Sequence, residues 1–294
     1  VYRGRIYQMG FEKNQILTVE ITDMTSDGEG IGKVDGFPFF IKDAIIGDQV
    51  RMRITRVKKN YAYGRLEKVL TPSPFRMEPG CVFHRQCGGC QLQAMSYERQ
   101  LQFKASKIRN NLIRIGGFEP ELIDRVMEPV VGMDEPFHYR NKAQYPIGED
   151  KSGNPIAGFY AGRTHDIIAN TNCSLGAKEN QEILEIILSY MRENHIPAYR
   201  ESTGEGLIRH VLIRKGFCSG ELMVCLVVNG EALPREAALV ERIRAACPET
   251  AGVVLNTNDR DTNVVLGERY RPLWGEDTLT DTLCGLRFRL SVPS

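Results

Sequence analysis

Three cysteines lie within ten residues of this 294-residue chain, at Cys81, Cys87 and Cys90, and a fourth candidate ligand, Cys173, follows far downstream. The first residues show no charged region followed by an apolar core of signal-peptide type, so we expect a cytoplasmic protein whose thiols stay reduced. Closely spaced thiols in that setting indicate a metal or cluster site, not disulfides. The cysteine segment also divides the chain, because short strand-like runs precede it and a larger mixed region follows it.

Composition sets the class of protein without revealing its function. With 42% hydrophobic and 26% charged residues, the chain has the profile of an ordinary globular protein. A formal net charge of +1 means that any nucleic-acid surface must arise from local clustering of cations. No apolar run approaches the roughly 18 residues of a membrane span, so we expect no membrane partner.

Five short strand-like runs fill the region from 15 to 70 and predict a small barrel. They are Ile16–Ile21, Gly30–Val34, Phe37–Ile41, Gln49–Val57 and Tyr61–Leu66. In the fourth run Val50, Met52 and Ile54 alternate with polar residues, which sends the apolar set to the core. Residues 1–14 are irregular and are given no role.

A basic stretch follows the last two of these runs. Seven Lys or Arg residues lie between Arg51 and Lys68, against the single acid Glu67, with tyrosines interleaved. Cations for phosphates and flat rings for unpaired bases are what an RNA-binding barrel needs, although a solvated strand face explains the pattern as well. The predicted RNA contacts here are Arg51, Arg53, Lys58, Lys59 and Tyr61.

The region from 75 to 290 predicts a mixed, mainly antiparallel α+β domain. Thr71–Pro74 is a proline-rich linker, and Ser96 is placed to cap a helix that runs to Ile115. Consecutive strand-like runs with helices inserted singly then favour an antiparallel layer, and one of these strands is predicted at Asn263–Gly267. Four further RNA contacts are predicted in this domain, at Arg140, Lys142, Arg209 and His210. For His210 a buried core position is an equally good interpretation.

Spacing alone leaves the chemistry of the cysteine segment open. A C-x2-C turn with Gly88 and Gly89 between its thiols suits an iron–sulfur cluster, whereas zinc sites more often pair two such turns. His84 is an alternative fourth ligand for zinc, and unligated thiols are a third possibility. The other four cysteines lie in or beside apolar patterns and are predicted to be buried structural thiols. They are Cys218, Cys225, Cys247 and Cys284.

These motifs together resemble the RNA uracil-C5 methyltransferases, most closely the cluster-bearing branch that modifies 23S ribosomal RNA. The resemblance rests on the basic barrel, the C-x5-C-x2-C segment and the distant Cys173. It also rests on Tyr139–Tyr145, Ala157–Ala161 and Gly206–His210, in the family's order. It implies a TRAM barrel that binds RNA and a [4Fe–4S] cluster ligated by Cys81, Cys87, Cys90 and Cys173.

The resemblance also implies a C-terminal domain that binds S-adenosylmethionine and carries the catalytic cysteine and base. This sequence contains neither the acidic-glycine loop of a methyl-donor site nor the proline-rich segment that leads to the catalytic cysteine. We therefore expect a chain truncated before its catalytic domain after 294, with no catalytic residue of its own. The helix at 97–115 would pack on that domain. The expected partner is ribosomal RNA, not DNA, and the expected state is a monomer. The alternatives are a zinc-stabilised RNA-binding module without enzymatic activity and a radical tRNA-modifying enzyme that carries a TRAM barrel.

Overall fold

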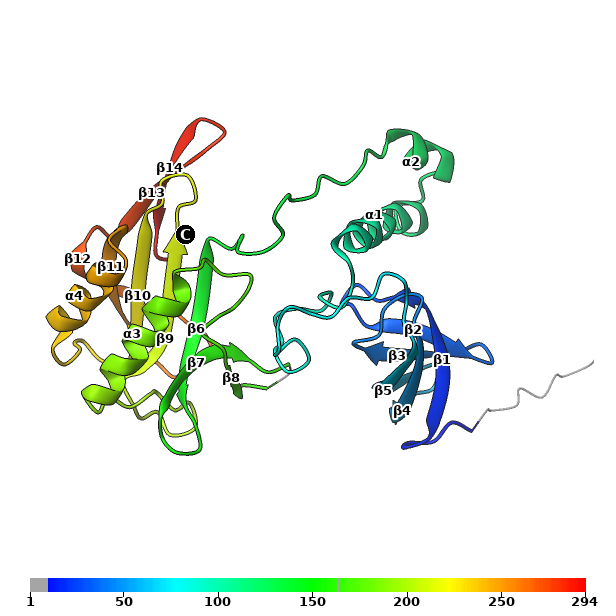
Figure 1. Ribbon diagram of the computed structural model, residues 1–294, viewed down its shortest axis with the longest axis horizontal. Coiled ribbons are helices and arrows are strands. Elements are labelled where there is room, and N and C mark those ends of the chain that lie inside the picture. Colours follow the sequence, from blue (N-terminus) through cyan, green and yellow to red (C-terminus); the bar gives the residue numbers. More distant parts are fainter. Residues whose placement is uncertain (1–9, 163) are drawn as a thin grey trace, which may run out of the picture. The chain divides into compact units, whose positions relative to one another are not determined.

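A computed structural model of the chain describes residues 10–162 and 164–294. The chain forms two compact units. The first holds the residues up to Arg85 together with Cys90–Met133, and the second holds Gln86–Gly89 together with Asp134–Ser294 (Figure 1).

The first unit is built on the predicted five-stranded barrel, which is confirmed. Its strands close in the order β1-β2-β3-β5-β4. Their bounds are Ile16–Met24, Gly30–Val34, Phe37–Lys42, Gln49–Val57 and Ala62–Thr71 for β1 to β5. The alternation predicted for β4 holds, since Val50, Met52 and Ile54 are fully buried in the barrel core while Arg51 is exposed. All pairs are antiparallel except β3 with β5, which run parallel.

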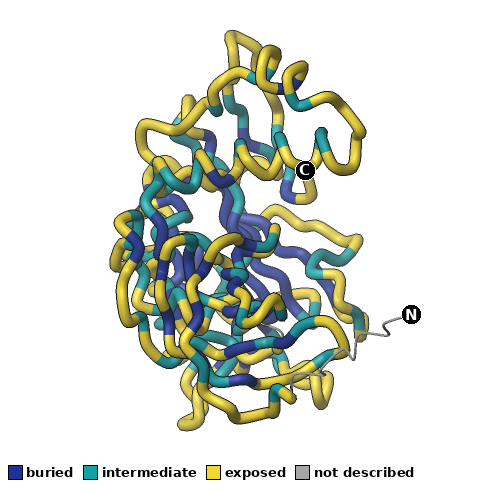
Figure 2. Tube along the Cα trace, turned by 90° about the vertical axis from the view of Figure 1, so that its right-hand side faces the viewer, coloured by how far each residue is buried: buried dark blue, intermediate teal, exposed yellow. Residues whose placement is uncertain are grey.

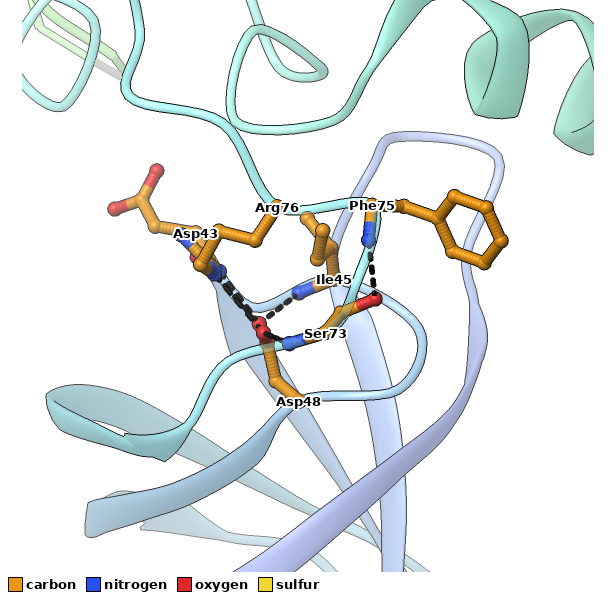
Figure 3. A network of polar contacts seen from close by, with 6 residues as sticks. All are labelled: Asp43, Ile45, Asp48, Ser73, Phe75 and Arg76. Atoms are coloured by element: carbon orange, nitrogen blue, oxygen red, sulfur yellow. Dashed lines mark hydrogen bonds and ion pairs between the residues drawn. The ribbon is translucent and has the colours of Figure 1, made fainter.

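A buried carboxylate fixes the segment after the barrel to the barrel itself. Asp48 is fully buried and accepts hydrogen bonds from the backbone amides of Ile45 and Ser73, at 2.8 and 2.9 Å. The Arg76 guanidinium donates to both Asp48 oxygens and also to the Asp43 carbonyl, at 2.8 Å (Figure 3). A buried charge is tolerated when it is paired and its remaining lone pairs are satisfied, as here. The proline-rich linker is therefore anchored over residues 73–76.

Two helices complete the first unit. Helix α1 spans Tyr97–Arg114, and the Ser96 hydroxyl caps it by accepting from the Arg99 amide at 3.4 Å. Helix α2, Pro120–Val126, was not anticipated from the sequence. The α1 residue Phe103 joins a small core with Met24, Ile45, Ala94 and Met95, which places the helix with the barrel. Further along α1, Ile108 is 54% exposed.

The second unit is a seven-stranded sheet with the order β12-β11-β10-β9-β6-β7-β8. Only β10 and β11 pair in parallel, so the predicted, mainly antiparallel α+β fold is confirmed. The strands β6 to β12 span Lys142–Glu149, Pro155–Tyr160, Ile167–Ala169, Ile208–Lys215, Leu222–Val228, Thr250–Thr257 and Arg269–Gly275. A separate hairpin, β13 (Thr278–Leu283) with β14 (Leu286–Ser291), follows.

Both faces of the central strands are covered, because β9 is buried over all but its last residue and β10 over its whole length; Figure 2 colours such buried stretches dark blue. Helices α3 (Asn180–Glu193) and α4 (Glu236–Ala246) pack on one face through α3 residues such as Ile183 and Ile187. On the other face, Leu279 and Val292 from the hairpin region pack on Met223 and Val227 of β10. The seven residues of β10 are consequently all buried.

The predicted strand at Asn263–Gly267 is wrong. These residues form a loop, and the pairing strand β12 begins at Arg269. The apolar run Val264 to Leu266 suggested a strand, but the Asn258 side chain donates to the carbonyls of Val264 and Val265, at 2.8 and 3.0 Å. Side-chain bonds to these carbonyls take the place of a strand ladder, so the segment stays a loop.

Candidate nucleic-acid interface and cysteine site

The outer face of the barrel gathers aromatic rings and cations from three strands. In the parallel pair β3–β5, Phe40 lies opposite Tyr63 and Lys42 lies opposite Arg65. In the antiparallel pair β4–β5, Arg53 lies opposite Arg65 and Arg56 lies opposite Tyr63. Because Phe39 and Ile41 point into the core, their neighbours Phe40 and Lys42 point outward. We call this surface, with Tyr61, the outer barrel face.

Three half-buried rings form a cluster on this face. The ring centroids of Phe40 and Tyr61 are 5.4 Å apart, those of Phe40 and Tyr63 are 5.9 Å apart, and those of the two tyrosines are 5.6 Å apart. Aromatic rings at these separations attract one another through their edges and faces. The cluster is separate from the barrel core, which is filled by other side chains. It is therefore a preformed apolar patch amid charged residues.

The predicted cations of this face differ in their availability. Arg53 is half-buried, and its Nε donates to Glu67 Oε1 at 2.7 Å; Arg51 approaches the other Glu67 oxygen at 3.5 Å. Lys59 is exposed and Lys58 is half-buried, and both lie in the turn that leads into Tyr61. Glu67 thus offsets part of the charge of the two arginines, while the lysines lie beside the aromatic cluster.

In the second unit, two of the predicted contacts lie near the start of β6. Arg140 is exposed, whereas Lys142 is half-buried and its Nζ donates to the Ser294 carbonyl at 3.3 Å. Burial, and then the nearby Arg214 charge, lower the pKa of Lys142. A lysine in that setting is a weaker attraction for phosphate than the exposed Arg140.

Arg209 is buried, and its guanidinium is occupied by backbone carbonyls. It donates to the carbonyl oxygens of Asn258 at 2.9 Å, Arg260 at 2.8 Å and Thr262 at 3.3 Å. Its guanidinium carbon lies 4.1 Å from the centre of the Tyr199 ring. Only 5% of the residue is exposed. This arrangement fits an arginine that holds a loop in place and argues against its prediction as a phosphate contact.

The neighbouring His210 is also buried. Burial, and after it the charge of Arg209, lower the pKa of His210 to about 4, although Glu201 acts in the opposite direction. A neutral imidazole inside a sheet supplies no cation for RNA. Of the two interpretations offered by the sequence, the core histidine fits these surroundings better.

The four cysteines of the predicted cluster are all half-buried. Cys81 and Cys90 belong to the first unit, and Cys87 and Cys173 belong to the second. Within residues 10–162 and 164–294, no three His, Cys, Asp or Glu side chains come together as a metal site. The ligand set therefore remains a prediction, and its test is chemical.

The surroundings of Cys87 nevertheless suit a thiolate ligand. The Gly89 amide lies 3.4 Å from the Cys87 sulfur and donates to it, a contact that stabilises ligating sulfurs. Cys87 forms a β-bridge with Ala161, and the Gly88 amide donates to the Tyr160 carbonyl at 3.1 Å. A Cβ on Gly88 would lie only 3.3 Å from the Tyr160 oxygen and the Gly162 backbone. A glycine lets the turn approach this closely.

The other four cysteines fall into two pairs. Cys225 and Cys247 are buried as predicted, and burial raises their pKa values to about 12 and about 11. Cys218 and Cys284 are exposed, so their prediction as buried thiols is wrong. Cys218 lies in the turn after β9, and Cys284 lies in the turn of the β13–β14 hairpin at a φ of 51°. Apolar neighbours in the sequence were a poor guide because both residues fall in turns.

Comparison with known proteins supports the barrel assignment. Residues 10–66 match the model of the TRAM domain. The chain is 40% identical over 287 residues to an RNA methyltransferase of Halalkalibacterium halodurans, and 41% identical over 283 residues to one of Bacillus cereus. These alignments cover 98% and 96% of this chain but 62% and 61% of the relatives. The chain thus spans about three-fifths of the length of the curated relatives it matches.

A solved structure resembles most of the chain. It is the Pyrococcus abyssi tRNA (uracil-54, C5)-methyltransferase in complex with S-adenosyl-L-homocysteine. The TM-score is 0.69 at 25% sequence identity, over 94% of this chain and 60% of that one.

No described helix has the length and apolarity that a membrane crossing requires.

The sequence predictions counted Arg65 in the basic stretch but did not include Phe40 and Lys42 in the outer barrel face. The alternation within Phe37–Lys42 contained part of the signal, since it places Phe40 and Lys42 opposite Phe39 and Ile41. What it lacked was the parallel pairing of β3 with β5, which brings Phe40 beside Tyr63. That pairing joins residues far apart in the chain.

Proposed function

We propose that this chain is the RNA-binding part of an S-adenosylmethionine-dependent RNA uracil-C5 methyltransferase that forms 5-methyluridine, with ribosomal RNA as its substrate. The observation that carries the proposal is the outer barrel face, where three clustered rings lie among cations within a matched TRAM domain. The names of the curated relatives and of the solved neighbour support the methyltransferase class.

The proposed role of the outer barrel face is to hold single-stranded RNA. Unpaired bases stack on aromatic rings whatever their identity, while lysines and arginines neutralise the phosphates between them. Tyr61 and Phe40 provide ring surface, and Lys58, Lys59 and Arg56 flank it. Arg51 and Arg53 are secondary contacts because Glu67 engages both. In the sheet unit, the exposed Arg140 is the remaining proposed phosphate contact, with Lys142 beside it.

The proposed cofactor of this chain is a [4Fe–4S] cluster on Cys81, Cys87, Cys90 and Cys173. Four thiols that are neither deeply buried nor in disulfides suit that group, and the amide directed at the Cys87 sulfur adds to the fit. The cluster would be structural here, tying together segments that are more than 80 residues apart in sequence, Cys90 and Cys173. Zinc on the same thiols is the alternative.

Methyl transfer is proposed for the whole protein, with S-adenosylmethionine as the methyl donor. In that chemistry a thiolate adds to C6 of uracil, C5 takes the methyl group, and a base then removes the C5 proton. We assign neither the thiolate nor the base to this chain, whose own part is to bind and orient the RNA. The chain alone, given S-adenosylmethionine and RNA, should transfer no methyl group. Measurable 5-methyluridine formation by the purified chain would contradict this division of roles.

RNA binding is tested by fluorescence anisotropy with a labelled, unstructured uridine-containing RNA. Replacing Tyr61 with Leu keeps an apolar side chain but removes the flat ring. The free energy of RNA binding should therefore become less favourable by about 1–3 kcal/mol. Tyr270→Leu is the control, because it removes an exposed tyrosine ring from β12 in the other unit. Equal affinities of wild type and Tyr61→Leu would remove the aromatic cluster from the interface. Fragments of ribosomal RNA and a tRNA, compared side by side, test the substrate class.

The cluster is tested by anaerobic purification followed by iron, sulfide and zinc analysis. We expect iron and acid-labile sulfide together with absorption in the visible region, and loss of all three signals in Cys87→Ser. Cys218→Ser is the control, since Cys218 is an exposed cysteine outside the proposed ligand set. Stoichiometric zinc without iron would replace the cluster by a zinc site.

A further inference from the structure

The loop that joins β11 to β12 lines a partly open cavity of about 520 Å³. Its walls come from this one segment, Thr257 to Arg269, and include Asn258, Arg260, Thr262, Val264, Leu266 and Glu268. Sites for small organic groups fall between about 300 and 1,000 Å³, so the volume is sufficient for a nucleobase with its sugar.

Three buried polar side chains hold this loop in shape. Asn256 is fully buried; its Nδ2 donates to the carbonyls of Gly267 and Arg269, and its Oδ1 accepts from the Gly267 amide at 2.8 Å. Asn258 is 2% exposed and donates to the carbonyls of Val264 and Val265. From β9, Arg209 donates to the Asn258 carbonyl at the start of the loop. Buried side chains that spend their hydrogen bonds on one loop preorganise it, as binding sites require.

The charges around the cavity are balanced within it. Arg260 pairs with Glu268 at 3.0 Å, and Arg269 pairs with Asp259 at 2.6 Å. A pocket for a free phosphate would present unpaired cations or converging amides. Here each arginine of the wall already faces a carboxylate, so the cavity favours a group without net charge.

The remaining wall combines apolar surface with hydrogen-bonding groups. Val264 is 62% exposed at the loop, and Leu266 is half-buried beside it. Thr262 and Asn258 add polar atoms on the same segment. A flat body with donors and acceptors on its edge, which is the chemistry of a nucleobase, matches a wall of this kind.

We propose that this cavity receives one unpaired nucleobase of RNA, packed against Val264 and Leu266 with its polar edge toward the loop. The inference rests on the proposed RNA-binding function and adds a second contact in the sheet unit. It also gives Arg209 a role: the guanidinium positions the loop that meets the base and does not touch the RNA itself.

The test is photo-cross-linking of the whole chain to an RNA oligonucleotide that carries 4-thiouridine, with the cross-linked peptides identified by mass spectrometry. A cross-link within residues 257–269 is expected. Val264→Trp fills the cavity mouth from an exposed position and should reduce that cross-link about tenfold, the equivalent of one lost base contact. Leu283→Trp, at a position 66% exposed on the β13–β14 hairpin, should leave it unchanged. Thermal melting checks that both variants fold.

The outcomes separate this inference from the proposed function. If no cross-link forms at the loop, the cavity assignment is overturned. If RNA binding is lost in Tyr61→Leu in that case, the proposed function of the barrel remains intact. A loop cross-link that survives unchanged in Val264→Trp overturns the cavity assignment as well. Uridine is added alone in a parallel NMR titration. If the loop resonances respond to uridine but the chain binds no RNA, the cavity is a nucleoside site, and both proposals fail.

Discussion

The outer barrel face and strand β9 of the sheet unit place similar residues in opposite surroundings. On the barrel, Lys58 and Lys59 lie beside Tyr61 at the surface. On β9, Arg209 lies over Tyr199, yet its guanidinium is enclosed by loop carbonyls and the adjacent His210 is buried. A cation next to an aromatic ring is therefore accessible to a partner only where the strand has a solvent face.

The difference follows from how many faces of a strand are covered. Strand β4 has the barrel core on one side and solvent on the other, so its alternating polar residues are exposed or, at Arg53, half-buried. Strand β9 has the helices on one face and loop and hairpin residues on the other, and all but its last residue are buried. In a doubly covered strand, polar residues must find partners inside the protein.

Replacing Arg209 should produce the largest effect on stability. Arg209→Met keeps the length of the side chain but leaves three loop carbonyls without their donor. The free energy of unfolding should therefore fall by roughly 4 kcal/mol. Arg51→Met on the barrel, where half of the side chain is exposed, should change the free energy of unfolding by less than about 0.5 kcal/mol. Urea denaturation measures both.

Hydrogen exchange localises the effect of Arg209. In the Met variant, the amides of residues 258–264 should exchange faster, while those of β10 keep their protection. If the two arginine variants were equally stable, the contrast between the barrel face and β9 would lose its energetic basis.

His210 should make the free energy of unfolding depend on pH. Its pKa is 6.5 when exposed and about 4 in the fold, so the unfolded chain binds the proton more tightly. The contribution of the neutral His210 to the free energy of unfolding is complete above pH 6.5 and is lost as the pH falls towards 4. At about 1.4 kcal/mol for each pKa unit, the full loss is about 3 kcal/mol.

The measurement compares wild type with His210→Gln in urea titrations from pH 4 to pH 7. The slope of stability against pH should be shallower in the variant, because the glutamine does not titrate. His195→Asn serves as the control, since His195 is exposed and Asn tolerates its φ of 52°. Parallel curves for wild type and His210→Gln would show that the histidine is accessible to protons in the folded state.

Sequence patterns were sufficient where structure is local. The alternation in β4, the Ser96 cap of α1 and the α+β order of the second unit all follow from neighbouring residues. The patterns failed where the hydrogen bonds of buried side chains decide the structure. The loop at 263–267 is held by Asn256 and Asn258, and Arg209 finds its acceptors about 50 residues away. No spacing rule identifies those pairs.

The site follows the same division. Spacing identified Cys81, Cys87 and Cys90 as candidate ligands, and composition identified the basic stretch of the barrel. The aromatic cluster required the β3–β5 register, and the loop cavity required the tertiary hydrogen bonds of Asn256, Asn258 and Arg209. Local chemistry is thus visible in the sequence, whereas its assembly on one surface is not.

The smallest predicted effect concerns the salt dependence of RNA binding, which separates phosphate contacts from solvated charges. Neutralising two phosphate contacts to a single strand should reduce the slope of log affinity against log salt by about 1.4. We expect this for the double variant Lys58→Gln/Lys59→Gln, measured by anisotropy between low and physiological salt. The double variant Lys151→Gln/Lys178→Gln removes two exposed lysines of the sheet unit and should leave the slope unchanged. Equal slopes in both variants would show that Lys58 and Lys59 are solvated side chains that do not contact phosphates. The aromatic cluster would then have to bind RNA without them.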